Sequence, residues 1–562
     1  MTLPSIRARN LAAAISIALA AGGLQAATIT VDSADDSPAS IACNLRSALK
    51  AVNDGSIAGV PLCSAAVSGD PFGTNDTIVL PGLSPITLTQ GALTVTASSV
   101  TINGTAGIPL PTFAPGSASA FPYQTIDAAG GSRVLAVADG VTLSANGLSL
   151  SGGQTAGNGG GVSIGAGATA VFSNCSVSSN FAANHGGAIY AAPTSTLTLI
   201  DSTLSGNSSL TGGALFADDS SVTVTNTSIA YNYASYAGGI YAVAGALILD
   251  QASIYANTAR TYSGGVSVTN GALTMTNSRV FANSGGRGGG MLLSFATGTI
   301  TRSTISGNTA ACRSFCAGAI LLDQSTFAVS DSTLSGNVAA GHANYIAGGA
   351  SVSDSTVTFV NSTVSGNVGV GDRNISGAFR EVQFLPYSGL TLINSTVTNN
   401  TAVAIYGTAA GGVLLDSLHF SPPASSSNNV DLRNTIVSGN VPAGSDIVVD
   451  TFSNSPTAQY SLLGSAQNIL AFNDPANHNV FSDAPGLGPL EDNGGPTWTH
   501  ALLPNSPALS AGSAALAMFS GQPLEFDQRG PGFARVFGGA VDIGAFEDQS
   551  DPLFADGFEG EP

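Results

Sequence analysis

A recurring asparagine is the feature that most constrains the fold of this chain. It occurs at successive intervals of 27, 25, 25, 26, 25, 29, 30, 33 and 40 residues. A period of this length is typical of a solenoid, in which each repeat forms one coil and stacks on the next. The positions are Asn180, Asn207, Asn232, Asn257, Asn283, Asn308, Asn337, Asn367, Asn400 and Asn440.

Other residues keep a fixed distance from this asparagine. Three residues before it, every repeat has Val, Leu or Ile, and eight residues before it, every repeat has a large apolar residue. Five residues before it, the residue is always small: Ser, Thr, Ala or, once, Cys175. A glycine pair, such as Gly186-Gly187 or Gly212-Gly213, opens a further apolar segment. Alternation of apolar and polar residues predicts three short strands per repeat, separated by Gly, Asn and Ser corners.

Three strands in about 25 residues predict one coil of a right-handed parallel β-helix, an all-β solenoid with a cap at each end. Each strand pairs with its equivalents in the adjacent coils, about 4.8 Å away, so identical positions stack. We expect the asparagine to occupy a corner, where its amide tolerates left-handed backbone and bonds to the next asparagine. Cys175 is predicted to be a stacked interior thiol rather than a nucleophile.

Two other repeat folds are inconsistent with the residues at these repeated positions. Leucine-rich repeats need Leu where this chain has Ser, Thr, Ala or Cys, and helix where it has Gly-rich strand. Propeller blades need about 40 residues with a Trp or Gly-His signature, and the chain has one Trp. Both folds are therefore excluded.

Composition agrees with a stacked fold and excludes one class of partner. Charged residues make up 9% of the chain, and 70 of the 562 residues are Gly. Like charges stacked in one column would repel, so neutral faces are expected. The net charge of −19, with Lys50 as the only lysine, excludes nucleic acid, because binding phosphate backbones needs a basic surface.

The ends of the chain differ from the repeats. Arg7 and Arg9 precede an apolar stretch too short to span a bilayer, which predicts a secretory signal, export and no transmembrane segment after cleavage. The predicted division is a signal peptide (1–26), an N-terminal cap with a helix around 43–53 (27–75), the β-helix (76–480), a closing C-terminal module (481–548) and an acidic tail (549–562).

The five cysteines suit an oxidising compartment. Cys43 can pair with Cys63 near the mature N-terminus, and Cys312 with Cys316 around a small loop. No Cys/His cluster has the spacing of a zinc site, so neither a metal nor another cofactor is expected.

Three parts of the chain resemble modules of exported bacterial proteins. Residues 27–32 and 43–53 resemble the CSLREA module, with departures at Asn44, Ser47 and Leu49. The Gly-Gly-Ala-Ile and aliphatic-x-x-Asn repeats are similar to those of chlamydial polymorphic outer membrane proteins, with Ile, Val or Leu in place of Phe. The resemblance implies a surface-associated, pectin-lyase-like β-helix and leaves its activity open. Residues 493–497, 505–508, 527–530 and 541–547 resemble the choice-of-anchor C-terminal domain.

Acidic residues bear on whether the chain is an enzyme. A lyase needs an Arg or Lys base beside calcium-binding carboxylates, and a glycoside hydrolase needs carboxylates within about 5–10 Å of each other. We interpret the adjacent pair Asp218-Asp219 as a solvated turn and assign no catalytic residue. Charged residues of the C-terminal module are predicted to form ion pairs: Asp527, Arg529, Arg535, Asp542 and Glu547.

Residues 251–322 form a basic stretch in an acidic chain, with arginines and no Asp or Glu. Stacking is expected to place three of the arginines on one edge, with Tyr255 and Tyr262 interleaved. This predicts an anion site suited to an acidic glycan or lipopolysaccharide. The alternative is that the arginines only offset repulsion from flanking acidic coils. The five arginines are Arg260, Arg279, Arg287, Arg302 and Arg313. Those expected on the shared edge are Arg260, Arg287 and Arg313.

The sequence therefore predicts a non-catalytic, exported β-helix, outside the cell or on the bacterial outer membrane, that binds glycans or host or cell-surface proteins. The alternative is a polysaccharide lyase or glycoside hydrolase that acts on acidic polysaccharide. A cluster of acids on one β-face would favour the enzyme, whereas a bare Ser/Thr/Asn surface would favour the scaffold. A surface protein without any ligand is the third possibility.

Overall fold

The computed structural model describes most of the chain. The predicted signal peptide, apart from Ala26, and all but the first two residues of the acidic tail lie outside the described residues. The described residues are 26–37, 40–69, 72–73, 75–82, 84–104, 123–383, 389–417, 429–449, 456–465 and 469–550.

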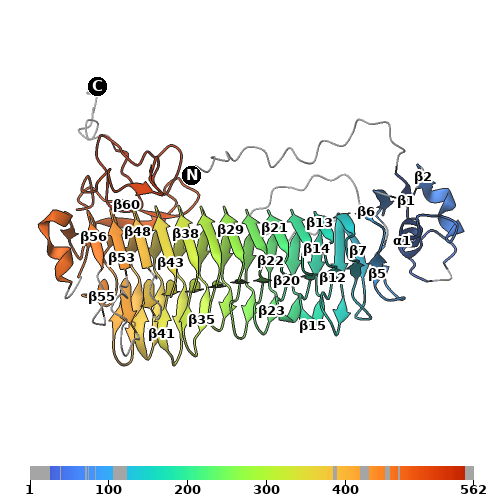
Figure 1. The fold of residues 1–562 in the computed structure, drawn as a ribbon, viewed down its shortest axis with the longest axis horizontal. Helices are drawn as coiled ribbons and strands as arrows, with labels where there is room; N and C mark the ends of the chain where they lie inside the picture. Colours follow the sequence, from blue (N-terminus) through green and yellow to red (C-terminus); the bar gives the residue numbers. More distant parts are fainter. Residues whose placement is uncertain are drawn as a thin grey trace, which may run out of the picture.

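The chain winds into an elongated parallel β-helix, which confirms the predicted fold (Figure 1). One coil illustrates its construction, and its strands belong in chain order to what we call the first, second, third and fourth sheets. These sheets contain 16, 15, 10 and 13 strands. The strands of this coil are β13 (Thr169–Ser173), β14 (Ser176–Ser178), β15 (Phe181–His185) and β16 (Ile189–Ala191).

The prediction of three strands per coil was therefore wrong, because most regular coils contain a fourth. The additional strand lies between the asparagine and the glycine pair, as β19 (Ser208–Thr211) does. Its residues lack an apolar alternation, so the sequence pattern conceals it. The strand forms because its backbone pairs with the next coil, Ser208 with Tyr233 and Ser209 with Ala234.

The predicted columns stack in register. Phe172 pairs with Leu199 in the first sheet, and Val177 pairs with Leu204 in the second. All of the residues eight and three positions before the asparagines are buried, with at most 1% of their surface exposed. Burial of apolar surface contributes about 25 cal/mol per Å², so these two columns supply much of the stability of the solenoid.

The asparagines form a continuous interior ladder. From Asn180 to Asn400, each side-chain Nδ2 donates to Oδ1 of the next asparagine at 2.8–3.0 Å. The left-handed conformation expected of the asparagine belongs instead to the residue before it, such as Ser179 (φ 57°) or Tyr231 (φ 58°). That preceding residue makes the turn, and the amide can then point inward and bond along the stack.

The column of small residues forms a second ladder. The hydroxyl of Ser303, for example, accepts the backbone N–H of Ser278 at 3.1 Å, and its own N–H donates to the hydroxyl of Ser332. Cys175 occupies the same column and is fully buried. Burial raises the pKa of its thiol to about 12, as expected for an unreactive interior cysteine.

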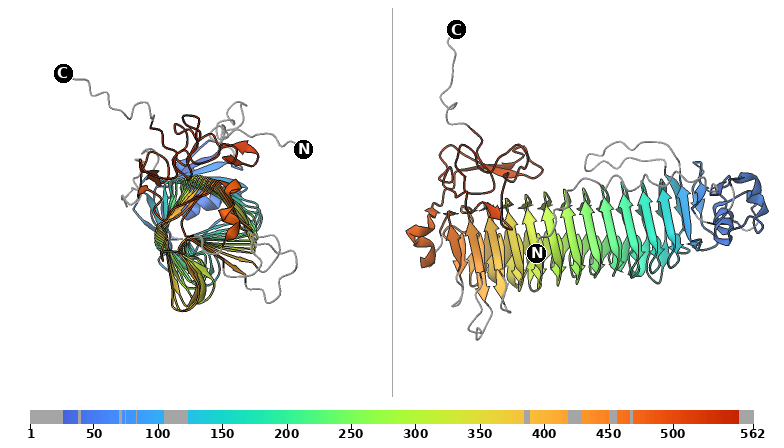
Figure 2. Two further views of the ribbon diagram at one scale, coloured as in Figure 1. Left: turned by 90° about the vertical axis from the view of Figure 1, so that its left-hand side faces the viewer. Right: turned by 45° about the horizontal axis from the view of Figure 1, so that its top comes forward.

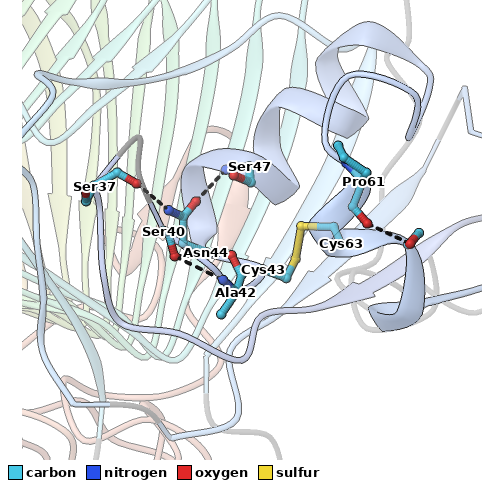
Figure 3. The surroundings of a disulfide bond; sticks show 9 residues. Ser37, Ser40, Ala42, Cys43, Asn44, Ser47, Pro61 and Cys63 are labelled. Carbon is cyan, nitrogen blue, oxygen red and sulfur yellow. Dashed lines mark hydrogen bonds between the residues drawn. A yellow bond between two sulfur atoms is a disulfide. The ribbon is translucent and has the colours of Figure 1, made fainter.

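The N-terminal cap is built into the solenoid. Strand β1 (Thr28–Thr30) pairs with β3 (Asp76–Val79) in the first sheet, and the predicted helix is α1 (Leu45–Asp54). Asn44 caps this helix by accepting the N–H of Ser47 at 2.8 Å. Cys43 forms a disulfide with Cys63, which joins the start of α1 to the 3₁₀ turn η1 (Pro61–Ala66) (Figure 3).

The C-terminal module does not close the end of the solenoid. Ile469 and Phe472, at the 3₁₀ turn η2 (Leu470–Asn473), join the core there, whereas the module packs along the side of the last coils (Figures 1 and 2). Polar side chains dock it on the second sheet: Thr363 Oγ1 donates to Gln528 Oε1 at 2.6 Å. The module therefore covers polar residues on the side of the solenoid, while the segment around η2 covers its last coil.

Four of the five charged residues predicted to form ion pairs in this module do so, whereas Asp542 accepts the backbone N–H groups of Ser510 and Asp548 instead. Arg529 contacts Asp527 at 2.6 Å, and Arg535 contacts Glu547 at 2.5 Å, with all four side chains buried. These ion pairs are structural. Among the described residues, none of the helices combines the length and the apolar character of a membrane-spanning helix.

Candidate ligand-binding groove

The five arginines of the basic stretch lie on two different parts of the surface. Arg279 is on β30 (Arg279–Phe281) of the second sheet, 5.1 Å from the centre of the Phe281 ring. Arg302 lies at the corner before that sheet, where its Nε donates to Asn277 Oδ1 at 3.0 Å. Tyr255 stacks on Phe281 at 4.9 Å. This cluster on the second sheet is separate from the other three arginines.

Arg260, Arg287 and Arg313 all lie in the loops between the third and fourth sheets, but they do not form one column. Ser263 pairs with Gly288, and Gly288 pairs with Ala317, so Arg287 is level with Tyr262 and with Cys316. Arg260 lies two residues before Tyr262 in its coil and is therefore not directly opposite Arg287. Arg313 lies inside a small loop closed by the Cys312–Cys316 disulfide. The three arginines therefore share one edge, as expected, but they do not stack in a single column because the loops differ in length.

An aromatic stripe runs along the outer face of the fourth sheet. It consists of Tyr190, Phe216, Tyr241 and Tyr262. The first three occupy equivalent positions on β16, β20 (Leu215–Asp218) and β24 (Ile240–Val243). Their ring centres are 5.9 and 5.4 Å apart, and Tyr262 follows at 6.4 Å. The three tyrosines are half-buried, so the stripe presents ring surface to solvent over successive coils.

The beginning of the stripe carries polar groups. Tyr190 donates its hydroxyl to Asp218 Oδ2 at 3.2 Å, so Asp218 is bonded rather than merely solvated. The His185 ring stacks on Phe216 at 4.4 Å, and burial lowers its pKa. Asp219, the other member of the acidic pair, is exposed at a left-handed turn, as predicted for a solvated position.

Beyond the stripe, longer corner loops add a fifth, four-stranded sheet, which we call the flap. The flap packs on the outer face of the fourth sheet, where Ala317 and Ala347 contact Leu292 and Leu321. In the end-on view of Figure 2, the coils extend as a lobe on one side of the solenoid. The strands of the flap are β36 (Cys316–Ala317), β41 (Asn344–Ala347), β46 (Arg373–Ser376) and β51 (Ala409–Ala410).

A cavity of about 390 Å³ lies where the flap meets the fourth sheet. It continues the stripe, because the N–H of Arg287 donates to the carbonyl of Tyr262 at 3.1 Å. Phe315 lines the cavity and stacks on Tyr345 at 4.8 Å. We call the stripe and the cavity together the groove. The residues that line the cavity are Arg287, Phe315, Leu321, Asp323, Gln324, Ser353 and Asp354.

Two carboxylates from adjacent coils meet in this cavity. Asp323 ends β37 (Ile320–Asp323) and pairs with Ser353, which ends β42 (Ala350–Ser353) and directly precedes Asp354. Burial raises the pKa of Asp323, and the charge of Asp354 adds to the effect. Arg287 and the hydroxyl of Ser294, which lies 3.4 Å from Asp323 Oδ2, oppose it.

The floor beside the cavity contains unsatisfied polar atoms. Leu321 pairs with Ser351, and Ser351 pairs with Arg380 on β47 (Phe379–Gln383). Arg380 is fully buried and bonds Asp416 Oδ2 through Nη2 at 2.7 Å, with its guanidinium 4.5 Å from the centre of the Tyr345 ring. Within the described part of the chain, the hydroxyl of Ser351 and the Nε and Nη1 groups of Arg380 have no hydrogen-bond partner.

Sequence reasoning missed the acids of the cavity. It searched for acids adjacent in the chain, whereas Asp323 and Asp354 are separated by a full coil. Counting from Gly318 and from the Gly348-Gly349 pair would have placed them close together, since Asp323 lies five residues after Gly318 and Asp354 lies six residues after Gly348. Among the described residues, no group of three or more His, Cys, Asp or Glu is placed to hold a metal ion.

A comparison with protein families agrees with the architecture. A family model described as "Right handed beta helix region" matches residues 135–298. The chain is also similar to pectate lyase Pel9A, with 13% identity over 93% of this chain and 97% of that one, at a TM-score of 0.26. No curated protein matches the chain. The family match and the strand register together identify the chain as a right-handed parallel β-helix protein.

Proposed function

We propose that this chain is an exported protein that binds a polysaccharide lengthwise along the groove. The observation that carries the proposal is the aromatic stripe, in which Tyr190, Phe216 and Tyr241 repeat in register and lead through Tyr262 to the cavity. Each coil advances about 4.8 Å, so an extended polymer meets a new ring at each coil. A compact ligand would use only one or two of these contacts.

The charges in the groove favour a neutral polysaccharide over the acidic one expected from the basic stretch. Arg287 is accompanied in the cavity by Asp323 and Asp354, and Asp218 lies at the other end of the stripe. Carboxylates accept hydrogen bonds from sugar hydroxyls but repel the carboxylates of an acidic sugar. Arg279 and Arg302, which could attract an acidic glycan, lie outside the groove.

Export is part of the same proposal. The signal pattern of residues 1–26 supports it, and so do the disulfides Cys43–Cys63 and Cys312–Cys316, because such bonds persist in oxidising compartments. Fractionation of the producing cell tests it: the mature chain should be found outside the cytoplasm and should begin at Ala27. A cytoplasmic chain that retains residues 1–26 would contradict export.

Affinity electrophoresis tests the binding. Gels containing a neutral β-glucan, mannan or xyloglucan should retard the protein more than gels containing pectate or lipopolysaccharide. Aromatic contacts contribute about 0.5–1.5 kcal/mol each, and about 1.4 kcal/mol is tenfold in affinity. The combined variant Tyr190→Ala, Tyr241→Ala, Tyr262→Ala should therefore bind about 100-fold more weakly.

The second sheet provides the matched control. Tyr231 and Tyr255 also pack against each other, with ring centres 5.6 Å apart, but they lie outside the groove. The variant Tyr231→Ala, Tyr255→Ala should keep full affinity. Loss of binding in this control, but not in the triple variant, would indicate that the ligand binds to the second sheet. Retardation by pectate alone, or by no polysaccharide, would overturn the proposal as stated.

A further inference from the structure

We infer that Asp323 and Asp354 form a hydrolytic centre that cleaves the neutral polysaccharide lying in the groove. This inference rests on the proposed binding function but adds an activity to it. The pair lies in a cavity that also offers a ring surface (Phe315), a cation (Arg287) and an amide (Gln324). These are the groups needed to hold a sugar unit beside two carboxylates.

The register sets the separation of the two acids. Asp323 is directly opposite Ser353, and parallel strands lie about 4.8 Å apart. Asp354 is one residue further along, and consecutive Cα atoms are about 3.8 Å apart. The backbones of Asp323 and Asp354 are therefore about 5–7 Å apart, so their carboxyl groups can adopt the separation of about 6.5–9.5 Å that leaves room for a water molecule in inverting glycoside hydrolases.

The two acids are in different environments, which suits two roles. Asp323 ends a strand and is partly buried beside Ser294, and this burial raises its pKa and favours the protonated form. Asp354 lies on the following left-handed turn, at φ 45°. The geometry thus assigns Asp323 as the general acid and Asp354 as the general base.

The reaction balances with water alone. Asp323 donates its proton to the glycosidic oxygen, and the bond between that oxygen and the anomeric carbon breaks. A water molecule attacks the anomeric carbon, and Asp354 accepts its proton. The products are two shorter chains, one with a new reducing end. The two carboxyl groups recover their starting states by exchanging a proton with solvent.

The floor of the groove gives an independent indication of a ligand. Ser351 and Ser353 are two residues apart on β42, so both side chains point to the same face of the sheet as the cavity. Ser351 is fully buried, yet none of the described residues offers its hydroxyl a hydrogen-bond partner. A buried polar group left unpaired costs about 1–3 kcal/mol, so such groups normally mark a bound partner. Ser351 pairs with Leu321, which lines the cavity, so a sugar hydroxyl entering there is the partner assigned to it by this inference.

Isosteric variants of the full chain test the inference. Wild type, Asp323→Asn and Asp354→Asn are incubated with β-glucan, mannan, xyloglucan and pectate, and new reducing ends are counted. Wild type should release product from a neutral polymer, and each variant should lose at least about 1,000-fold of this rate, because both proton transfers are needed. Retardation in affinity gels should change less than threefold, since neither change removes a ring contact.

Asp219 offers a matched control for Asp354. It occupies the equivalent left-handed turn after the fourth sheet, at φ 40°, but lies several coils away from the cavity. The variant Asp219→Asn should hydrolyse at the wild-type rate. The wild-type rate should also fall as the pH rises through the raised pKa of Asp323, and no such fall should remain in Asp323→Asn.

Each failure has a distinct meaning. Retardation by a neutral polymer without any release of reducing ends would overturn the hydrolytic centre and leave the binding function standing. Release that is unchanged in Asp323→Asn and Asp354→Asn would place catalysis elsewhere and also overturn the inference. Absence of both retardation and release across the panel would overturn the binding function together with the hydrolytic centre.

Discussion

The coils before Asn308 and those after it use the same core but differ in their corners. Before Asn308 the repeat is 25–27 residues, and its outer surface carries simple columns such as the aromatic stripe. After Asn308 the repeat lengthens to 29–40 residues, and the additional residues build the flap and bury charged groups. Regular repetition therefore makes the rod, whereas irregular corner loops make the enclosed site on its side.

The two regions also differ in what stabilises them. Ladders of neutral Asn and Ser side chains satisfy buried polar groups in both regions. In the later coils, a charged pair, Arg380–Asp416, also lies fully buried beneath the flap, where Asn374 donates to Asp416 at 3.0 Å. Loss of a ladder residue should destabilise mainly the adjacent coils. Loss of one charge of the buried pair should leave the other charge without a counter-ion in an apolar environment.

The largest expected effect is in the later coils. Asp416→Leu leaves the Arg380 guanidinium buried without its counter-ion, which should lower the free energy of unfolding by about 3–5 kcal/mol. The double variant Arg380→Met, Asp416→Leu should recover most of this loss, because a well-packed apolar pair can replace a buried ion pair. Urea denaturation measures both. Equal losses in the single and double variants would contradict the role of the charge.

The regular coils should respond to loss of one ladder amide. Asn257 donates to Asn283 Oδ1 and to the Ile229 carbonyl, and accepts from the N–H and the amide of Asn232. Asn257→Ala should destabilise the chain by about 3 kcal/mol, because several buried groups lose their partners. Hydrogen exchange should increase mainly in the two adjacent coils. A uniform increase along the whole solenoid would contradict local ladders.

The interface with the C-terminal module should depend on pH. Burial raises the pKa of Asp331 to about 6, and its carbonyl accepts the hydroxyl of Thr497 from the module. Because the folded-state pKa lies above the ordinary value, the folded chain holds this proton more tightly, so stability is lost as the pH rises from about 4 to 6. Asp331→Asn should remove this dependence and stabilise the chain by about 2 kcal/mol at pH 7.

Thermal midpoints at pH 4.5 and pH 7 measure this effect. The difference between the variant and the wild type should be largest at pH 7 and clearly smaller at pH 4.5. A difference that is the same at both values would contradict titration of Asp331 as the cause.

The smallest effect is expected at Cys175. Its neighbour one coil on is Ser202, and serine fills this column in most repeats, so Cys175→Ser should change stability by less than about 1 kcal/mol. The folded wild type should not react with a thiol reagent, since burial raises the thiol pKa to about 12. Rapid labelling in the folded state would contradict an interior position.

The columns of the solenoid were predictable because each depends only on spacing within the chain. Val177, Asn180 and Cys175 occupy the places that counting assigned to them, and their neighbours in space are the residues one period away. The third sheet was not predictable, since strands such as β19 carry no apolar alternation and form by backbone pairing. The left-handed residue was misplaced by one position because the pattern marks the corner but not its backbone angles.

The sequence by itself therefore determined that this chain is a right-handed parallel β-helix, because a constant period forces like residues to stack. The tertiary structure alone decided how the corners are arranged. Loops of unequal length shift the register there, so Arg260, Arg287 and Arg313 share an edge without forming a column, and the flap encloses Asp323 and Asp354 in one cavity. Contacts between corner loops depend on loop length and packing, and no spacing within a single coil encodes them.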